Sequence, residues 1–141
     1  MVSLKVKVIE FIGSMNDGGA ETLVKDYAIL LDKAKFEIQI LTIYGLNNSA
    51  NSNRIKKNNI EISSVFRNRT IITRLIKKTI GKWYIPIYMM MIILKKKPKV
   101  LHVHLELLKY VASIRKILNY YNVKIVYTCH NVPERYFFNN N

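Results

Sequence analysis

The first residues that could do chemistry form a glycine-rich segment near the N-terminus. Residues 13–21 read Gly-Ser-Met-Asn-Asp-Gly-Gly-Ala-Glu and follow an apolar, β-rich run. Glycines allow close approach of a ligand to the backbone, and free N–H groups at a helix start attract anions. The spacing of Gly13, Gly18 and Gly19 fits neither G-x-G-x-x-G nor a P-loop, which disfavours NAD binding and P-loop nucleotide hydrolysis. Two interpretations stay open: a phosphate-binding turn, or a tight turn that only packs the helix on a sheet.

Two histidines, His102 and His104, alternate with apolar residues in another β-rich run. This alternation places both side chains on one face of a strand. His104, at the end of the strand, can reach a cleft, whereas His102 is expected to be a satisfied core or supporting histidine. Such a pair can bind metal, but no acidic or cysteine cluster completes a site nearby, so we expect no metal. Glu106 opens the next helix, where the helix dipole favours a carboxylate with or without a ligand.

A third group, Cys129, His130 and Asn131, follows the last β-rich run. His130 and Asn131 could hydrogen-bond a sugar hydroxyl or a phosphate, and His130 could also transfer a proton near neutral pH. The alternative is a plain turn with Asn131 as a local cap. Neighbouring residues on a strand point to opposite faces, so Cys129 beside His130 does not indicate a thiol enzyme.

Alternating strands and helices must position these three groups. Five β-rich apolar runs predict strands, at residues 6–12, 36–44, 60–66, 100–104 and 123–128. Helices are expected from residue 20 to about residue 35, within 67–99 and over 106–121, and the Asn- and Ser-rich residues 46–59 are expected to form an exposed, mobile loop. The pattern predicts an α/β fold: a Rossmann-like parallel sheet with helices on both faces. In such sheets ligands bind beyond the carboxyl ends of the strands, where all three groups fall.

Length and cysteine content limit the class of protein. A chain of 141 residues suffices for one domain. One cysteine excludes an internal disulfide framework and a multi-cysteine zinc site, which makes a reducing cytoplasm the default. The longest apolar run, residues 83–94, contains Pro86 and is shorter than the roughly 20 residues of a membrane-spanning helix.

The net charge of +14 predicts an anionic partner such as phosphate, nucleic acid or lipid head groups. Residues 54–99 hold thirteen basic residues against one acid, Glu61, and this segment is expected to lie away from the glycine loop. Aromatic and methionine side chains between the basic clusters suit an anionic membrane surface. The alternative is a core-facing helix with solvated basic ends. The candidate membrane or acceptor surface comprises Arg74, Lys77, Lys78, Lys82, Trp83, Lys95, Lys96 and Lys97.

Three motifs, in order and after successive predicted strands, resemble the N-terminal domain of retaining, family-4-type GT-B glycosyltransferases. They are residues 12–22 (Ile-Gly-Ser-Met-Asn-Asp-Gly-Gly-Ala-Glu-Thr), residues 99–104 (Lys-Val-Leu-His-Val-His) and residues 126–131 (Val-Tyr-Thr-Cys-His-Asn). Residues 31–38 also resemble the family, and the resemblance covers essentially the whole chain. Such enzymes transfer a sugar from a nucleotide-sugar to an acceptor held by the N-terminal domain, in a cleft between two Rossmann-like domains.

The resemblance implies roles for individual residues. The backbone of Gly18 and Gly19 would lie near the donor diphosphate and the reacting sugar. His130 would contact the donor sugar and is the candidate catalytic residue. The other implied contacts to donor or substrate are Glu21, His104, Glu106 and Asn131. The nucleotide-sugar is a substrate, and neither a cofactor nor a metal is expected.

The sequence also departs from the family. Most donor contacts in the family, including two glutamates seven residues apart, lie in a C-terminal domain, and no glutamates here have that spacing. Residues 1–141 are therefore expected to be a partial N-terminal domain that is inactive alone. A truncated frame, one subunit of a split enzyme that pairs with a C-terminal half, and a degenerate remnant all remain open.

The function expected from the sequence is that of the acceptor-side domain of a glycosyltransferase. It would serve surface polysaccharide or lipopolysaccharide synthesis with a lipid-linked or other glycan acceptor, in the cytoplasm and peripheral to the inner face of the cell membrane. The alternative is a non-catalytic basic Rossmann-like module that binds anionic lipid or nucleic acid. Nucleic acid is not the expected partner, because the basic segment has no helix-turn-helix or RNA-binding aromatic signature.

Overall fold

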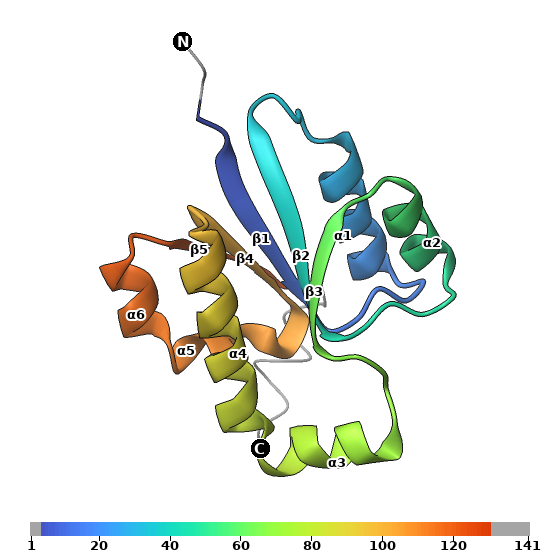
Figure 1. The fold of residues 1–141 in the computed structure, drawn as a ribbon, viewed down its shortest axis with the longest axis vertical. Coiled ribbons are helices and arrows are strands. Elements are labelled where there is room, and N and C mark those ends of the chain that lie inside the picture. The colour runs from blue at the N-terminus through green and yellow to red at the C-terminus, as the bar shows by residue number, and fades with distance from the viewer. Residues whose placement is uncertain (1–3, 131–141) are drawn as a thin grey trace.

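A five-stranded parallel sheet forms the centre of the protein in the computed structural model, which describes residues 4–130 (Figure 1). The strand order is β3-β2-β1-β4-β5. The strands are β1 (Val6–Ile12), β2 (Phe36–Tyr44), β3 (Glu61–Phe66), β4 (Val100–His104) and β5 (Lys124–Thr128). The predicted parallel α/β fold and all five predicted strands are confirmed.

The central strand β1 pairs with β2 on one side and with β4 on the other. The chain therefore reverses its direction of winding between β1 and β4, and in parallel α/β sheets ligands bind beyond the carboxyl ends at such a switch point. The register places Glu10 of β1 directly opposite His102 of β4. A glutamate and a histidine that are far apart in the sequence thus share one face of the sheet.

Two helices cover the face of the sheet that carries Glu10. They are α1 (Gly19–Leu30) and α2 (Ala50–Lys57). Val24 of α1 and Ile55 of α2 are fully buried against Ile12 and Ile40 of the sheet. The predicted helix is confirmed, but its buried stripe consists of Ala20, Val24 and Ala28, whereas Leu30 of the apolar spacing that predicted it is 76% exposed.

Three helices cover the opposite face: α4 (Gly81–Lys96), α5 (Leu108–Ala112) and α6 (Arg115–Tyr120) (Figure 1). Helix α4 buries Ile85, Met89 and Ile93, which recur every four residues and therefore line one side of the helix. Leu118 of α6 is buried in the same cluster. The core-facing interpretation of residues 83–94 is thus correct for one side of α4.

Helix α3 (Ile71–Thr79) lies off the sheet, beyond the carboxyl end of β3, and packs against α4 (Figure 1). It begins with a capping box, in which the Thr70 hydroxyl accepts a hydrogen bond from the Thr73 backbone and the Thr73 hydroxyl accepts one from Thr70. None of its nine residues is buried. Its position is set by the capping box, by α4 and by Ile76, which is partly buried and packs against the core.

Two expectations about secondary structure are wrong. Residues 46–59 are not an exposed, mobile loop, because α2 forms there and buries Asn51, Ser52 and Ile55. The expected helix over 106–121 is broken into a 3-10 turn (Leu105–Leu107), α5 and α6. The break after α5 falls at Ser113, whose hydroxyl donates to the Tyr110 carbonyl and so competes with helical pairing.

Candidate functional site

The buried carboxylate of Glu10 is the centre of the candidate site. His104 Nε2 donates to Glu10 Oε2 at 2.6 Å, and His102 Nδ1 reaches the same oxygen at 3.0 Å. The strand register produces this contact, because Glu10 and both histidines point to the face covered by α1. Glu10 is 2% exposed and His104 is 0% exposed, so solvent does not screen their interaction.

The two histidines decide the charge state of Glu10. Burial alone would raise the pKa of the Glu10 carboxyl. Hydrogen bonds from His102 and His104, together with the positive charge that each ring carries when protonated, hold that pKa below its usual 4.5. Glu10 is therefore ionised at neutral pH. A buried carboxylate fixes which ring nitrogen of each histidine carries the proton.

A hydrogen-bonded relay runs from Glu10 through His104 to His130. His104 Nδ1 lies 2.9 Å from His130 Nε2, and the two rings stack with centroids 5.2 Å apart. Because neutral His104 donates from Nε2 to Glu10, its Nδ1 accepts a hydrogen bond from His130 Nε2–H. His130 Nδ1 is then the nitrogen with the lone pair, which can accept a hydrogen bond from a hydroxyl or take up a proton.

A parallel branch of the network supports His102. Its Nε2 lies 2.7 Å from Thr128 Oγ1, at the end of β5. Since His102 Nδ1 donates to Glu10, neutral His102 accepts the Thr128 hydroxyl proton at Nε2. Both ring nitrogens of His102 are thus satisfied, which agrees with the supporting role expected for it.

The electrostatic surroundings of His130 favour its neutral form. Burial lowers the pKa of His130 below 6.5. Repulsion from His104 and His102, when these rings are protonated, lowers it further, while Glu21 raises it in part. Glu21, in the first turn of α1, acts on His130 through its charge, whereas His104 contacts His130 directly. Of the residues predicted for the site, the structure thus joins His104 and His130 by a hydrogen bond.

The glycine loop places Glu21 through Gly18, the N-cap of α1. A Cβ atom on Gly18 would lie 2.2 Å from Glu21 Oε2, whereas one on Gly19 would meet nothing within 4 Å. The carboxylate of Glu21 thus folds back over Gly18, at the helix end where negative charge is favoured. A side chain at position 18 would therefore displace the Glu21 carboxylate from its place over the helix end.

Helix α2 holds the glycine loop in place. Backbone N–H groups of Ala50 and Asn51 donate to the Asp17 carboxylate at 3.2 and 3.0 Å. The hydroxyls of Ser49 and Ser52 both donate to the Met15 carbonyl, at 2.6 and 2.9 Å. The polar residues that suggested a mobile segment therefore satisfy the backbone of the neighbouring loop.

Other predictions for the site turn out differently or fall outside the described residues. His104 was expected to be able to reach a cleft from the end of β4, but its side chain is fully buried and contacts His130. Glu106 lies in the 3-10 turn Leu105–Leu107 after β4, and its charge raises the pKa of Lys77 of α3 slightly against larger opposing effects. Asn131 lies outside the described residues.

The basic residues predicted as one surface fall into two groups. Arg74, Lys77, Lys78 and Lys82 line one cavity of about 580 Å³ at the carboxyl edge of the sheet. Residues 95–97 lie at the opposite end of α4, about 20 Å away at 1.5 Å per helical residue. Lys96 there is paired with Glu61.

The basic cavity also adjoins the glycine loop. Tyr44, the last residue of β2, lines this cavity, and its backbone N–H donates to the Gly13 carbonyl at 3.1 Å. None of residues 13–21 lines the cavity, so the basic helix α3 is linked to the glycine loop only through Tyr44. Figure 1 shows α3 below the sheet, between the end of β3 and the start of α4.

Sequence reasoning missed Glu10. The expectation that no acidic group completes the pair of His102 and His104 is wrong, because ligand atoms of these three residues lie within 4.8 Å of one another. One carboxylate and two imidazoles are a donor set that suits Zn²⁺. The signal that could have found Glu10 is a charged residue among the apolar side chains of residues 8–12, the buried part of β1.

Known proteins resemble this chain in two respects, a sequence family and a fold. The model of Glycosyltransferase Family 4 matches residues 17–141. A solved structure described as a UDP-N-acetylglucosamine 2-epimerase from Listeria monocytogenes matches with a TM-score of 0.52 and 12% identity, over 89% of this chain and 31% of that one. At that identity the likeness shows the fold alone. No curated protein matches the chain. Because the family model covers most of the sequence, from the glycine loop onward, this chain belongs to Glycosyltransferase Family 4.

Proposed function

We propose that this chain is the acceptor-side domain of a glycosyltransferase, which moves a sugar from a nucleotide-sugar to a lipid-linked glycan acceptor in surface polysaccharide or lipopolysaccharide synthesis. The observation that carries the proposal is the relay from Glu10 through His104 to His130 beside the glycine loop. Family membership supports glycosyl transfer as the reaction class. The chain covers 31% of the length of the solved structure that it matches. In this proposal a donor-binding half completes the enzyme.

In this proposal His130 contacts the transferred sugar. The buried relay keeps its Nε2–H pointed at His104, so Nδ1 accepts a hydrogen bond from a sugar hydroxyl. The lowered pKa keeps His130 neutral near pH 7, which preserves this acceptor. Glu10 and His104 act as positioning residues, because they are buried and touch the sugar only through His130.

The backbone at the start of α1 serves the donor in the same proposal. Gly18 and Gly19 precede a twelve-residue helix whose first N–H groups attract a diphosphate. The Glu21 carboxylate covers Gly18. When the donor binds, this carboxylate moves aside or accepts a hydrogen bond from a sugar hydroxyl. Asn131 stays a proposed donor contact next to His130 in the sequence.

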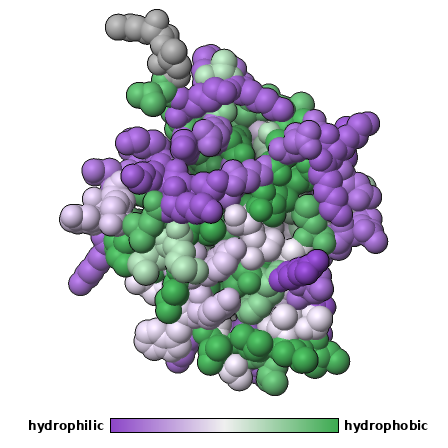
Figure 2. Space-filling view, in the orientation of Figure 1, coloured by the Kyte–Doolittle hydropathy of each residue, from purple (hydrophilic) through white to green (hydrophobic). Residues whose placement is uncertain are grey.

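The proposed cellular site is the inner face of the cell membrane. Among residues 4–130 no helix is both long and apolar enough to cross a membrane. However, α3 exposes Ile71, Ile72 and Leu75 by 84%, 70% and 60%, and α4 exposes Trp83 by 68%. Figure 2 shows the hydrophobic side chains gathered at the end of the molecule where α3 lies. Apolar side chains beside lysines favour adsorption to an anionic membrane.

Transfer of labelled sugar tests the proposal. The chain would be combined with a family-4 donor-binding domain and assayed with a panel of nucleotide-sugars and a membrane lipid extract. We expect transfer, and we expect His130→Ala to lower it by about 100-fold or more. Lys57→Ala, an exposed change on α2, serves as the control.

The proposal fails if His130→Ala retains full transfer while the variant is folded by circular dichroism. It also fails if no donor supports transfer although the chain binds its partner domain and the lipid extract. Binding of oligonucleotides in preference to anionic vesicles would instead favour a non-catalytic basic module.

A further inference from the structure

The basic cavity at the carboxyl edge of the sheet is built for an anion. Six cationic side chains line its volume of about 580 Å³, and no acidic residue of the described chain lines it. The six are Arg69, Arg74, Lys77, Lys78, Lys82 and Lys109. Like charges held this close repel one another, and the repulsion is relieved when an anion enters.

Aromatic rings hold several of these cations in place. The Arg69 guanidinium and the Lys77 ammonium lie 5.6 and 5.7 Å from the centre of the Tyr44 ring. The Lys109 ammonium lies 5.4 Å from the centre of the Tyr110 ring. Cations over ring faces are partly ordered before a ligand arrives, which lowers the entropic cost of binding. Burial and the neighbouring cations Lys109 and Arg69 also lower the pKa of Lys77, against a smaller opposing effect of Glu106.

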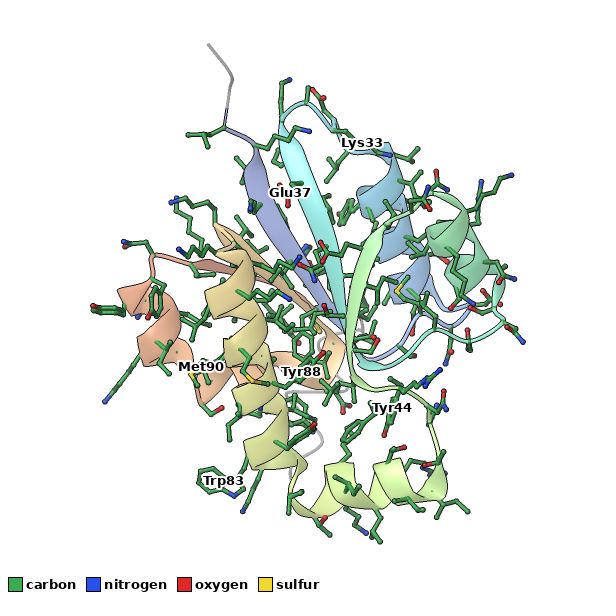
Figure 3. The ribbon with its side chains drawn as sticks, in the orientation of Figure 1. Lys33, Glu37, Tyr44, Trp83, Tyr88 and Met90 are labelled. Carbon is green, nitrogen blue, oxygen red and sulfur yellow. The ribbon has the colours of Figure 1, made fainter. Side chains whose placement is uncertain are left out.

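An apolar groove continues directly from this cavity. It has a volume of about 440 Å³ and shares Lys82 and Lys109 with the cavity. Beyond these lysines its lining includes Trp83, Pro86, Ile87, Met90, Ile114 and Ile117. Figure 3 shows Trp83 and Met90 on α4, with Met90 on the side toward α6.

The groove continues along α4 toward the C-terminal end of this helix. Met90 and Ile117 also line a further hollow of about 370 Å³, together with Leu94 and Tyr121. From Lys82 to Leu94 this path follows twelve helical residues, which is about 18 Å. The surface therefore has a cationic head site at one end and an apolar path leading away from it.

We infer that the cavity and the groove together bind one amphiphile, a long apolar chain that ends in a phosphate or diphosphate. This inference rests on the proposed function and names the class of acceptor for the same carboxyl edge. Charge complementarity identifies the head, because several lysines and arginines around one cavity match a phosphate-bearing group. The apolar lining identifies the tail. If the ligand were a free phosphate or a nucleic acid, most of this apolar surface would have no partner.

Binding of farnesyl diphosphate to the full 141-residue chain tests the inference. Trp83 is the one tryptophan of the sequence, so its fluorescence reports on the groove directly, and calorimetry gives the affinity. Inorganic pyrophosphate supplies the head alone and farnesol the tail alone. We expect farnesyl diphosphate to bind at least about tenfold more tightly than either part.

Matched variants separate the two halves of the site. Lys109→Ala should weaken both farnesyl diphosphate and pyrophosphate by about tenfold, while Lys57→Ala on α2 leaves both unchanged. Ile87→Asp should weaken farnesyl diphosphate and leave pyrophosphate unchanged. Met91→Asp is its control, because Met91 is as exposed as Ile87, at 53% against 52%, and does not line the groove.

Several outcomes would overturn the inference. Equal affinity for pyrophosphate and farnesyl diphosphate would indicate a free-phosphate site, and equal affinity for farnesol a site for neutral lipid. Competition by a single-stranded oligonucleotide at lower concentration than pyrophosphate would indicate a nucleic-acid surface. Unchanged binding in both Lys109→Ala and Ile87→Asp would show that the ligand sits elsewhere.

The failure of this inference and that of the proposed function are distinguishable. Sugar transfer to an acceptor without a phosphate, combined with no binding of farnesyl diphosphate, would leave the function standing and remove the lipid-phosphate site. Binding of farnesyl diphosphate without transfer in the presence of a donor-binding domain would do the reverse.

Discussion

Glu10 and His104 stand ninety-four residues apart in the sequence, yet the Glu10 Oε2 and His104 Nε2 atoms are 2.6 Å apart in the interior of the protein. Parallel pairing of β1 with β4 creates this contact. The hydrogen bond makes His104 an acceptor toward His130, so a group in the core controls a group at the edge of the sheet.

The buried acceptor at Glu10 contributes to stability. Glu10→Ala leaves His102 and His104 without their shared acceptor, and we expect the free energy of unfolding to fall by ~1–3 kcal/mol. Glu10→Gln keeps one acceptor oxygen and should cost less. Urea unfolding at pH 7 measures both, with the exposed Glu37→Ala as control. Equal stability of the wild type and Glu10→Ala would contradict the prediction.

The charge of Glu10 makes stability depend on pH. The pKa of Glu10 is lower in the folded protein than its usual 4.5, so the stabilising contribution is complete above 4.5 and is lost as pH falls through the folded pKa. The stability difference between the wild type and Glu10→Gln should therefore stay constant from neutral pH down to about 4.5 and shrink below it. Urea unfolding across this range measures the difference. A difference that grows with acidification would show the opposite sign.

His130 should remain neutral at physiological pH. Burial, together with repulsion from His104 and His102 when these rings are protonated, places its pKa below 6.5, and Glu21 opposes this shift. Glu21→Gln removes the opposing charge, so we expect the pKa of His130 to fall further. Titration of the imidazole signals by NMR measures both values. A pKa above 6.5 in the wild type, or a rise in the variant, would count against this arrangement.

The contact between Asp17 and the start of α2 anchors the glycine loop. Asp17→Ala removes the acceptor for the Ala50 and Asn51 N–H groups, and we expect a loss of ~1 kcal/mol in the free energy of unfolding. Amide hydrogen exchange in residues 13–19 should also accelerate. Asn53→Ala, an exposed change within α2, is the matched control. Unchanged exchange in the Asp17 variant would mean that other contacts fix the loop.

The two sides of α4 should respond differently to the same substitution. Met89 is fully buried and Met91 is 53% exposed on the same helix. Met89→Ala should lower the free energy of unfolding by ~2–5 kcal/mol through lost packing and a residual cavity. Met91→Ala should change it by no more than ~0.5 kcal/mol. Chemical unfolding of both variants tests this. Similar costs for the two would mean that α4 is packed on both sides.

Local patterns sufficed to predict the strands and the fold class. Apolar β-rich runs mark strands wherever both faces of a sheet are covered, and the periodicity of α1 changes visibly after Gly19. Polar segments were harder to interpret. The Ser and Asn residues of α2 look like a loop because their partners, Met15 and Asp17, belong to another part of the chain.

The candidate site was predictable at its edge and not at its centre. His130 and Glu21 follow strand ends, which sequence can locate. Glu10 acquires its role only through the order of strands in the sheet, which places β1 beside β4. The grouping of Lys82 with Lys109 likewise depends on how α4 and α5 pack, and local sequence does not contain that information.

Helix α3 contributes no buried side chain, although it supplies three of the six cations of the basic cavity. Substitutions of these three cations cost the core little, because Ile76 is the α3 residue that packs against it, so the wall of the cavity is free to diverge while the sheet stays constant. Proteins that share this sheet can thus change the charge of this cavity through a single peripheral helix, without a loss of stability that other mutations would have to restore.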